Sequence, residues 1–374
     1  MSPNSDQNSL EIAQRYAALI DRPPSSFLSL TRGLLLDHSK GHTTPISRTA
    51  FLLRRLAKGP SVLSPLYHAV LSLREISDED GQAMSFRDVL AQFANDELAA
   101  LISVIYFVAR AKAMSEKDEW PFISSHLEKS LNIGWRIGES IKKIGPAYGL
   151  LTGGFPIIGL ATFLKHDKPG FKEYRRSLKS NARWLDHKYE LKKWGCTCFQ
   201  IGATFVQQSG FGIPVAEAFS AIDGRENFDT MDISESFLKV WTTAWWLRGL
   251  YEKSRAPKPH PVQEESNYLP GEEGLPELLR QALRYKDASG EFNWAEKPKD
   301  SISPRTHPKL FGISKAAVAA PVAAPQESQD DAAAIPYESL PVHIKEILSQ
   351  EEWEGLGADE AAQLMKEMGG EPTE

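Results

Sequence analysis

Three short stretches of the chain carry residue types that could do chemistry. His166 and Asp167 are adjacent, and a pair of this kind can help to hold a divalent metal ion that activates a water for attack on a phosphoester. Cys196 and Cys198 offer the soft sulfur ligands that zinc accepts. The glycines within residues 149–154 could let backbone amides approach a phosphate group.

Each of these stretches lacks partners that its chemistry requires. A metal site needs several convergent ligands, and the Cys-x-Cys pair with His187 upstream falls short of a four-ligand zinc pattern. Residues 149–154 lack the Gly-Lys-Ser/Thr ending of a phosphate-binding loop. We therefore expect a surface-loop histidine at His166, packed thiols at Cys196 and Cys198, and no catalytic, metal-ligating or cofactor-binding residue.

The segment 165–193 is a candidate binding surface. It holds ten Lys or Arg residues and four acidic residues, with Tyr174, Trp184 and Tyr189 between them. A basic helix over residues 172–193 would suit a nucleotide phosphate or an RNA backbone. The alternative is a solvated helix whose aromatic side chains face the core. Four cations are predicted to share one face of this helix and are candidate interaction residues: Arg175, Arg176, Lys179 and Arg183.

The composition is that of an ordinary soluble protein of 374 residues with a formal net charge of −6. The two cysteines are too close in sequence to pair with one another, which fits the reducing environment of the cytoplasm. The uncharged run 144–164 is long enough to span a bilayer. Its seven Gly and Pro residues predict a turn followed by a shorter buried helix, so we expect no membrane insertion.

Helical periodicity runs through most of the chain, and no stretch shows the alternation typical of a strand. The sequence therefore predicts an all-α fold. Apolar residues spaced by three and four positions indicate helices over residues 98–109 and 233–251. The tryptophans of the second of these helices are predicted to be core residues before they are a stacking surface. Residues 125–128 have the spacing of a capping box at a helix start. Gly153 and Gly154 are predicted to lie in a tight turn.

Residues 149–214 resemble the central part of an HD-related output domain (HDOD), the all-helical relative of the HD metal phosphohydrolases. The shared outline includes an apolar helix and a basic amphipathic helix. The residues that carry the resemblance are Gly149-Leu-Leu, Pro169 with Tyr174, Gly195 with Gly202-Ala203, and the turn Phe211-Gly-Ile-Pro214.

The metal ligands of the HD enzymes are missing from this outline. These enzymes carry His-Asp directly after the Gly-Leu-Leu, where this chain has Thr152 and Gly153. A later histidine position is taken by Cys198, and the paired histidines expected further on fall near Asp223 and Gly224. The resemblance therefore implies an HD-like helical bundle without the metal cage.

The same resemblance implies a non-catalytic, cytoplasmic output module of bacterial signalling. Such a module acts through contacts with a protein partner, which the sequence does not identify, and its oligomeric state is likewise open. The alternatives are a divergent metal phosphohydrolase and a binder of nucleotides or nucleic acids that uses the basic helix.

The sequence divides into four predicted regions. Residues 1–58 are a helical extension, 59–254 the HDOD-like domain, 255–336 a mostly disordered Pro- and Ala-rich linker, and 337–370 an acidic helical segment. The linker has too few large apolar residues to offset the entropy lost on ordering. One helical stretch is expected within it, at residues 275–285.

The acidic C-terminal segment is predicted to be a detachable docking element. From residue 326 onward there are thirteen Asp or Glu residues and two Lys residues. Its partner would be another protein or, in cis, the basic segment around Arg175. A solubilising tail that touches nothing is the alternative. The segment also supplies apolar candidate interaction residues: Ile344, Ile347, Leu348 and Trp353.

Removal of residues 326–374 is expected to leave the melting temperature of the domain unchanged. If the segment docks in cis, the backbone NMR resonances around Arg175 shift on truncation, and they shift less at high salt. The reason is that exposed charges are screened over about 8–10 Å at physiological salt. Random-coil tail resonances at both salt concentrations, with no shift around Arg175, would contradict docking in cis.

Overall fold

The computed structural model describes residues 3–57, 60–74, 86–115, 118–222, 233–272 and 274–287, together with Pro336, Tyr337 and Leu340. No strand occurs among these residues, so the predicted all-α fold is confirmed. The helices are α1 (Pro3–Ala17), α2 (Ser25–Ser39), α3 (Ser47–Ala57), α4 (Pro60–Leu73), α5 (Phe86–Ala91), α6 (Asn95–Met114), α7 (Trp120–Ser140), α8 (Pro146–His166), α9 (Lys168–Ser180), α10 (His187–Trp194), α11 (Cys198–Gln208), α12 (Ile213–Ser220), α13 (Glu235–Lys253), α14 (Pro261–Glu265) and α15 (Gly274–Asp287).

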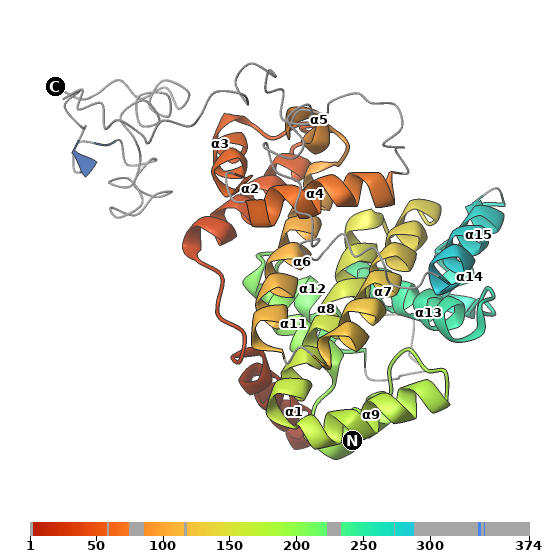
Figure 1. The fold of residues 1–374 in the computed structure, drawn as a ribbon. Helices are drawn as coiled ribbons and strands as arrows, with labels where there is room; N and C mark the ends of the chain where they lie inside the picture. Colours follow the sequence, from red (N-terminus) through yellow and green to blue (C-terminus); the bar gives the residue numbers. More distant parts are fainter. Residues whose placement is uncertain are drawn as a thin grey trace, which may run out of the picture.

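Helix α8 is the centre of the bundle and packs against α6, α7, α11 and α13. Helices α2 to α5 cover one end of the bundle, α13 to α15 lie along one side, and α1 and α9 lie at the opposite end (Figure 1). By length and composition, α8 is the one helix of the described residues that could cross a membrane. Its most apolar window is 94% buried among these neighbours.

The predicted turn at Gly153 and Gly154 is wrong, because both residues lie within the continuous helix α8. Pro156 is also inside this helix, although it provides no amide hydrogen for the helical ladder. The turn was predicted from the local preference of glycine and proline for turns. In this helix the packing of the neighbouring helices determines the conformation, and the glycines make room for those neighbours.

Helices α7 and α8 are antiparallel neighbours whose backbones touch. A Cβ atom added at Gly134 would lie 2.3 Å from the carbonyl oxygen of Gly149, and one at Gly138 would lie 2.4 Å from that of Gly145. A Cβ at Gly153 would lie 2.3 Å from the carbonyl oxygen of Ser130. Small residues therefore recur every fourth position on both helices, and together they set the distance between the two helix axes.

Helix α1 belongs to the same core, since it packs on α8 and α11. Ala13 and Tyr16 of this helix and Ile20 after it are buried, whereas Leu10 is 37% exposed. The Tyr16 ring meets that of Phe163 edge-on at a centroid distance of 5.1 Å. The N-terminal extension thus shares a core with the central helices.

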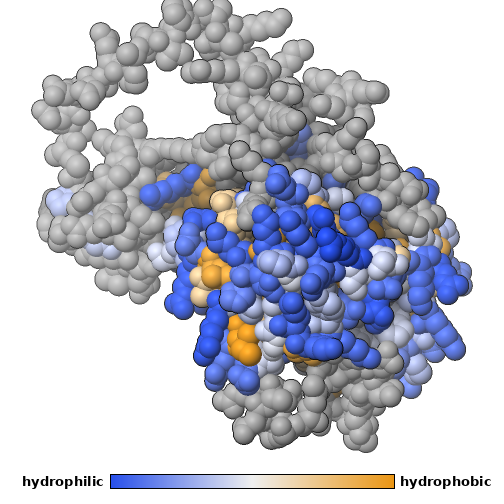
Figure 2. Space-filling view, turned by 60° about the horizontal axis from the view of Figure 1, so that its bottom comes forward, coloured by the Kyte–Doolittle hydropathy of each residue, from blue (hydrophilic) through white to orange (hydrophobic). Residues whose placement is uncertain are grey.

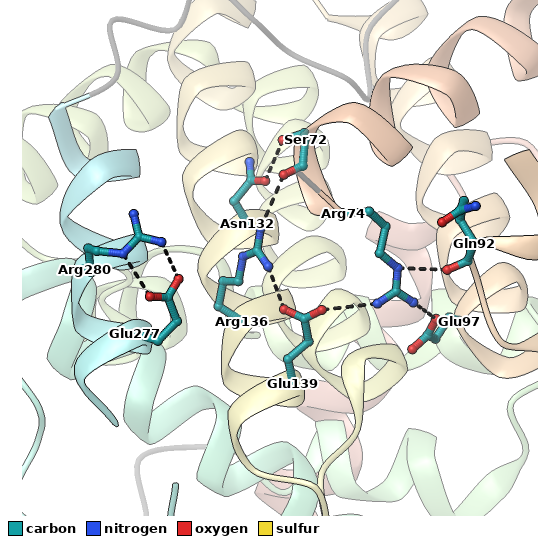
Figure 3. A network of polar contacts seen from close by, with 9 residues as sticks. All are labelled: Ser72, Arg74, Gln92, Glu97, Asn132, Arg136, Glu139, Glu277 and Arg280. Atoms are coloured by element: carbon teal, nitrogen blue, oxygen red, sulfur yellow. Dashed lines mark hydrogen bonds and ion pairs between the residues drawn. The ribbon is translucent and has the colours of Figure 1, made fainter. Parts of the chain in front are cut away.

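Arg74, which follows α4, ties α4, α6 and α7 together (Figure 3). Its guanidinium group donates to Glu97 at 2.7 Å and to Glu139 at 3.2 Å, and its Nε donates to the carbonyl oxygen of Gln92 at 2.8 Å. The same group lies over the Trp135 ring, 4.8 Å from its centroid. The partly buried guanidinium group of Arg74 therefore fixes the relative position of three helices.

Helices α14 and α15 fall in the range assigned to the linker. Helix α15 contains the expected helical stretch 275–285 and packs against α7 and α13. Residues 288–335 lie outside the described residues. The capping box predicted at residues 125–128 is wrong, because α7 begins five residues earlier, at Trp120, with Pro121 in its first turn.

Gly153→Ala is expected to lower the free energy of unfolding by about 1–3 kcal/mol, because its Cβ meets backbone that a rotamer change cannot move. This loss outweighs the roughly 1 kcal/mol that alanine gains over glycine in a helix. Urea unfolding would measure it. Gly271→Ala is the matched control, since an added Cβ meets nothing within 4 Å there. Equal stability of the two variants would contradict the close contact of α7 and α8.

Candidate functional site

The predicted basic helix over 172–193 is two helices, α9 and α10, joined by the loop 181–186. Helix α9 ends at Ser180, and Ala182, two residues later, has a positive φ of 48° that turns the chain. Helix α10 begins after Asp186, whose side chain accepts a hydrogen bond from the Tyr189 amide at 3.1 Å. The prediction of one continuous helix face was therefore wrong, and Arg183 lies in the loop.

The four predicted cations have different surroundings. Arg175 donates to Glu119 at 2.6 Å, and Arg183 forms an ion pair with Asp186. The Lys179 ammonium lies 5.8 Å from the centroid of the Phe122 ring. Arg176 is exposed.

The predicted residues of the C-terminal segment lie outside the described part of the chain. They are Ile344, Ile347, Leu348 and Trp353. Shortly before them in the sequence the structure describes Pro336, Tyr337 and Leu340, of which Leu340 is buried.

Lys179 and Arg183 both line a pocket that lies between α7, α9 and α13. We name it the basic pocket. It has a volume of about 210 Å³. Among the residues that the structure describes, three cations line it and no carboxylate does. The lining residues are Phe122, His126, Lys129, Ile133, Leu178, Lys179, Ala182, Arg183 and Tyr251.

His126 and Tyr251 form a fixed pair at this pocket. The His126 Nε2 lies 2.8 Å from the Trp184 carbonyl oxygen, which can only accept, so Nε2 carries the proton. Nδ1 consequently accepts from the Tyr251 hydroxyl at 2.6 Å. Burial, with a smaller contribution from the positive charge of Lys129, lowers the pKa of His126 to about 4. The imidazole is therefore neutral at physiological pH.

Trp184 holds the 181–186 loop in place. Its backbone amide donates to Glu252 at 3.1 Å, and its indole Nε1 donates to the Ser130 hydroxyl at 2.9 Å. With the His126 bond, three hydrogen bonds link this residue to α7 and α13. The loop is thus set in position without a ligand.

The other side of the loop borders a larger pocket of about 390 Å³, which we name the aromatic pocket. Of its described lining residues, Asp186 is the one carboxylate, and Arg183, Lys188 and Arg248 are the cations. Arg183 lines both pockets. Much of the remaining wall of the aromatic pocket consists of aromatic rings: Trp184, Phe199, Phe237, Trp241 and Trp245.

The tryptophans of α13 were predicted to be core residues before they are a stacking surface. Trp241 and Trp246 are buried, as predicted, whereas Trp245 is half-buried. The Trp245 and Trp241 rings lie 5.5 Å apart, and the Trp245 indole donates to the Lys258 carbonyl oxygen at 3.1 Å. Trp245 is therefore a fixed, half-buried ring that lines the pocket.

The comparisons with known proteins give no match. No protein-family model, curated protein or solved structure is similar to this chain. The function has to be inferred from the geometry of the described residues.

The His166-Asp167 pair has a structural role. Asp167 accepts from the Gly170 amide at 2.9 Å and from the Trp194 indole at 3.2 Å, so it caps the start of α9. The Gly170 bond is the main cause that lowers the pKa of Asp167. His166 is exposed at the end of α8, as expected, and its ring meets that of Tyr16 edge-on.

Both cysteines are buried free thiols. Burial raises the pKa of Cys196 to about 12 and that of Cys198 well above its ordinary value, so both stay protonated. The Cys198 amide donates to the buried carboxylate of Glu190 at 2.8 Å, and the Tyr174 hydroxyl donates to the same carboxylate. Among the described residues, no three His, Cys, Asp or Glu side chains are grouped in a way that could hold a metal ion.

Between pH 7 and pH 5 the unfolded chain gains a proton at residue 126, whereas the folded chain, with a pKa of about 4, does not. This residue alone is therefore expected to remove about 2 kcal/mol from the free energy of unfolding as the pH falls. His126→Gln should lose less stability than the wild type over this interval by that amount. Urea unfolding at both pH values would measure the difference. Equal losses would contradict a buried neutral His126.

Proposed function

We propose that the chain is a non-catalytic binding module whose ligand is a small anion with a flat ring, of the nucleotide class. The observation that carries this proposal is the composition of the aromatic pocket. Stacking surfaces and phosphate-binding cations face the same space there. Nucleotide binding is one of the alternatives that the sequence leaves open, and it is thus the function that the geometry supports best.

The size and chemistry of the aromatic pocket support a ligand of this class. A volume of about 390 Å³ lies within the range of roughly 300–1,000 Å³ typical of small-molecule sites. The half-buried ring of Trp245 offers a face for stacking a base. Arg183 and Arg248 carry the guanidinium groups that match phosphate oxygens in geometry and charge.

The packing of α8 supports binding without metal catalysis of the HD type. Thr152 and Gly153 stand where the HD enzymes carry His-Asp, and Thr152 is fully buried. An aspartate at position 153 would place its Cβ atom 2.3 Å from the Ser130 carbonyl oxygen. The contact of α7 and α8 therefore leaves no space for a ligand side chain at that position.

The end of the molecule with α1 and α9 carries many polar residues. Figure 2 shows this end turned to the viewer, and its coloured surface is mostly hydrophilic, with small separate apolar patches. The signalling role and the protein partner that the HDOD resemblance implies stay predictions.

Titration of the full chain with AMP and GMP, followed by tryptophan fluorescence, tests the proposal. We expect saturable quenching, and we expect Arg248→Gln to weaken binding by roughly tenfold or more through loss of a charged hydrogen-bond donor. Arg176→Gln is the matched control, because Arg176 is exposed and lines neither pocket. Absence of quenching at millimolar nucleotide would overturn the proposal. Chromatographic evidence of metal-dependent hydrolysis of the nucleotide would contradict its non-catalytic part.

A further inference from the structure

We infer that the basic pocket holds the phosphoryl group of this ligand, so that the two pockets form one site divided by the 181–186 loop. The inference rests on the proposed function, since it takes the ring of the ligand to lie in the aromatic pocket. It adds the position and the charge of the group that the second pocket would bind.

The charge of the basic pocket is the first argument. Lys129, Lys179 and Arg183 face one volume of about 210 Å³. No carboxylate of the described residues lies within ion-pair distance of either lysine. Two full positive charges at one small pocket thus have no carboxylate partner among the described residues, and a multiply charged oxyanion would neutralise them.

The carboxylates around the pocket are already engaged elsewhere. Glu119 binds Arg175 at 2.6 Å and lies 3.8 Å from the Lys172 ammonium. Asp186 pairs with Arg183 and also caps α10. These contacts hold the acids away from the two lysines.

The walls of the pocket strengthen the attraction to an anion. Phe122, Ile133 and Leu178 are apolar, and charges interact more strongly beside such surfaces than in bulk water. The polar hydrogens of His126 Nε2 and of the Tyr251 hydroxyl are already used in bonds within the protein. Because Arg183 is already paired with Asp186, binding would depend mainly on Lys129 and Lys179. Two positive charges favour a doubly charged phosphoryl group over a carboxylate.

The two pockets are close enough for one small ligand. Arg183 lines both of them. On α13, Arg248 faces the aromatic pocket and Tyr251 the basic pocket, three residues apart. Such residues are separated by about one turn, or roughly 5 Å along the helix axis. A base, a sugar and a phosphate in line are long enough for this span.

Isothermal titration calorimetry of the full chain with inorganic pyrophosphate, adenosine and ADP tests the inference. We expect Lys129→Met and Lys179→Met each to weaken pyrophosphate and ADP binding by roughly tenfold or more, and to leave adenosine binding unchanged. Lys192→Met is the matched control, because Lys192 is exposed on α10 and lines neither pocket. Melting temperatures equal to that of the wild type show that each variant is folded.

The outcomes separate the two proposals. If ADP binds to both lysine variants as tightly as to the wild type, the phosphoryl group lies elsewhere, and the inference is wrong while the proposed function stands. If pyrophosphate binds in a lysine-dependent way but no nucleotide does, the proposed function is wrong and the anion site stands. If neither pyrophosphate nor ADP binds, both are overturned.

Discussion

The contact between the backbones of α7 and α8 is the constraint on which the rest of the structure depends. Small residues at every fourth position, such as Gly134 on α7 and Gly149 on α8, let peptide groups of the two helices touch. Helix α8 is then enclosed by α6, α11 and α13, which remove its remaining apolar surface from water. Helix α7 is left with side chains that face two other regions, the Arg74 network near its end and the basic pocket near its start.

Ser130 links this helix contact to the candidate site. Its carbonyl oxygen lies against Gly153, and its hydroxyl accepts the hydrogen bond from the Trp184 indole. Ser130 therefore takes part both in the close contact of α7 and α8 and in the anchoring of the 181–186 loop. The pockets on both sides of that loop are formed by the same packing that forms the core.

Much of the fold could be predicted from the sequence, since helical periodicity survives in most segments and the α13 tryptophans were assigned to the core. The errors at Gly153, Gly154 and residues 172–193 share one cause. Each prediction used the local conformational preference of the residue types, whereas contacts with residues far away in the sequence determine the conformation there. Among the residues that line the candidate pockets, Lys179 and Arg183 lie in a visibly basic segment and were named from the sequence. The residues that complete the pockets come from α7 and α13, far away in the sequence, and a single lysine, histidine or arginine within an amphipathic helix carries no local signal. The main ones are His126, Lys129, Arg248 and Tyr251.

The backbone contact of α7 and α8 also constrains how this protein can diverge. When two side chains meet, a larger residue on one side can be compensated by a smaller one on the other. Where a Cβ atom would meet a carbonyl oxygen, as at Gly134, Gly149 and Gly153, no second substitution can make room. Related chains should therefore keep small residues at this spacing even where the lining of both pockets has changed. The spacing would identify the fold, and the pocket residues would vary with the ligand.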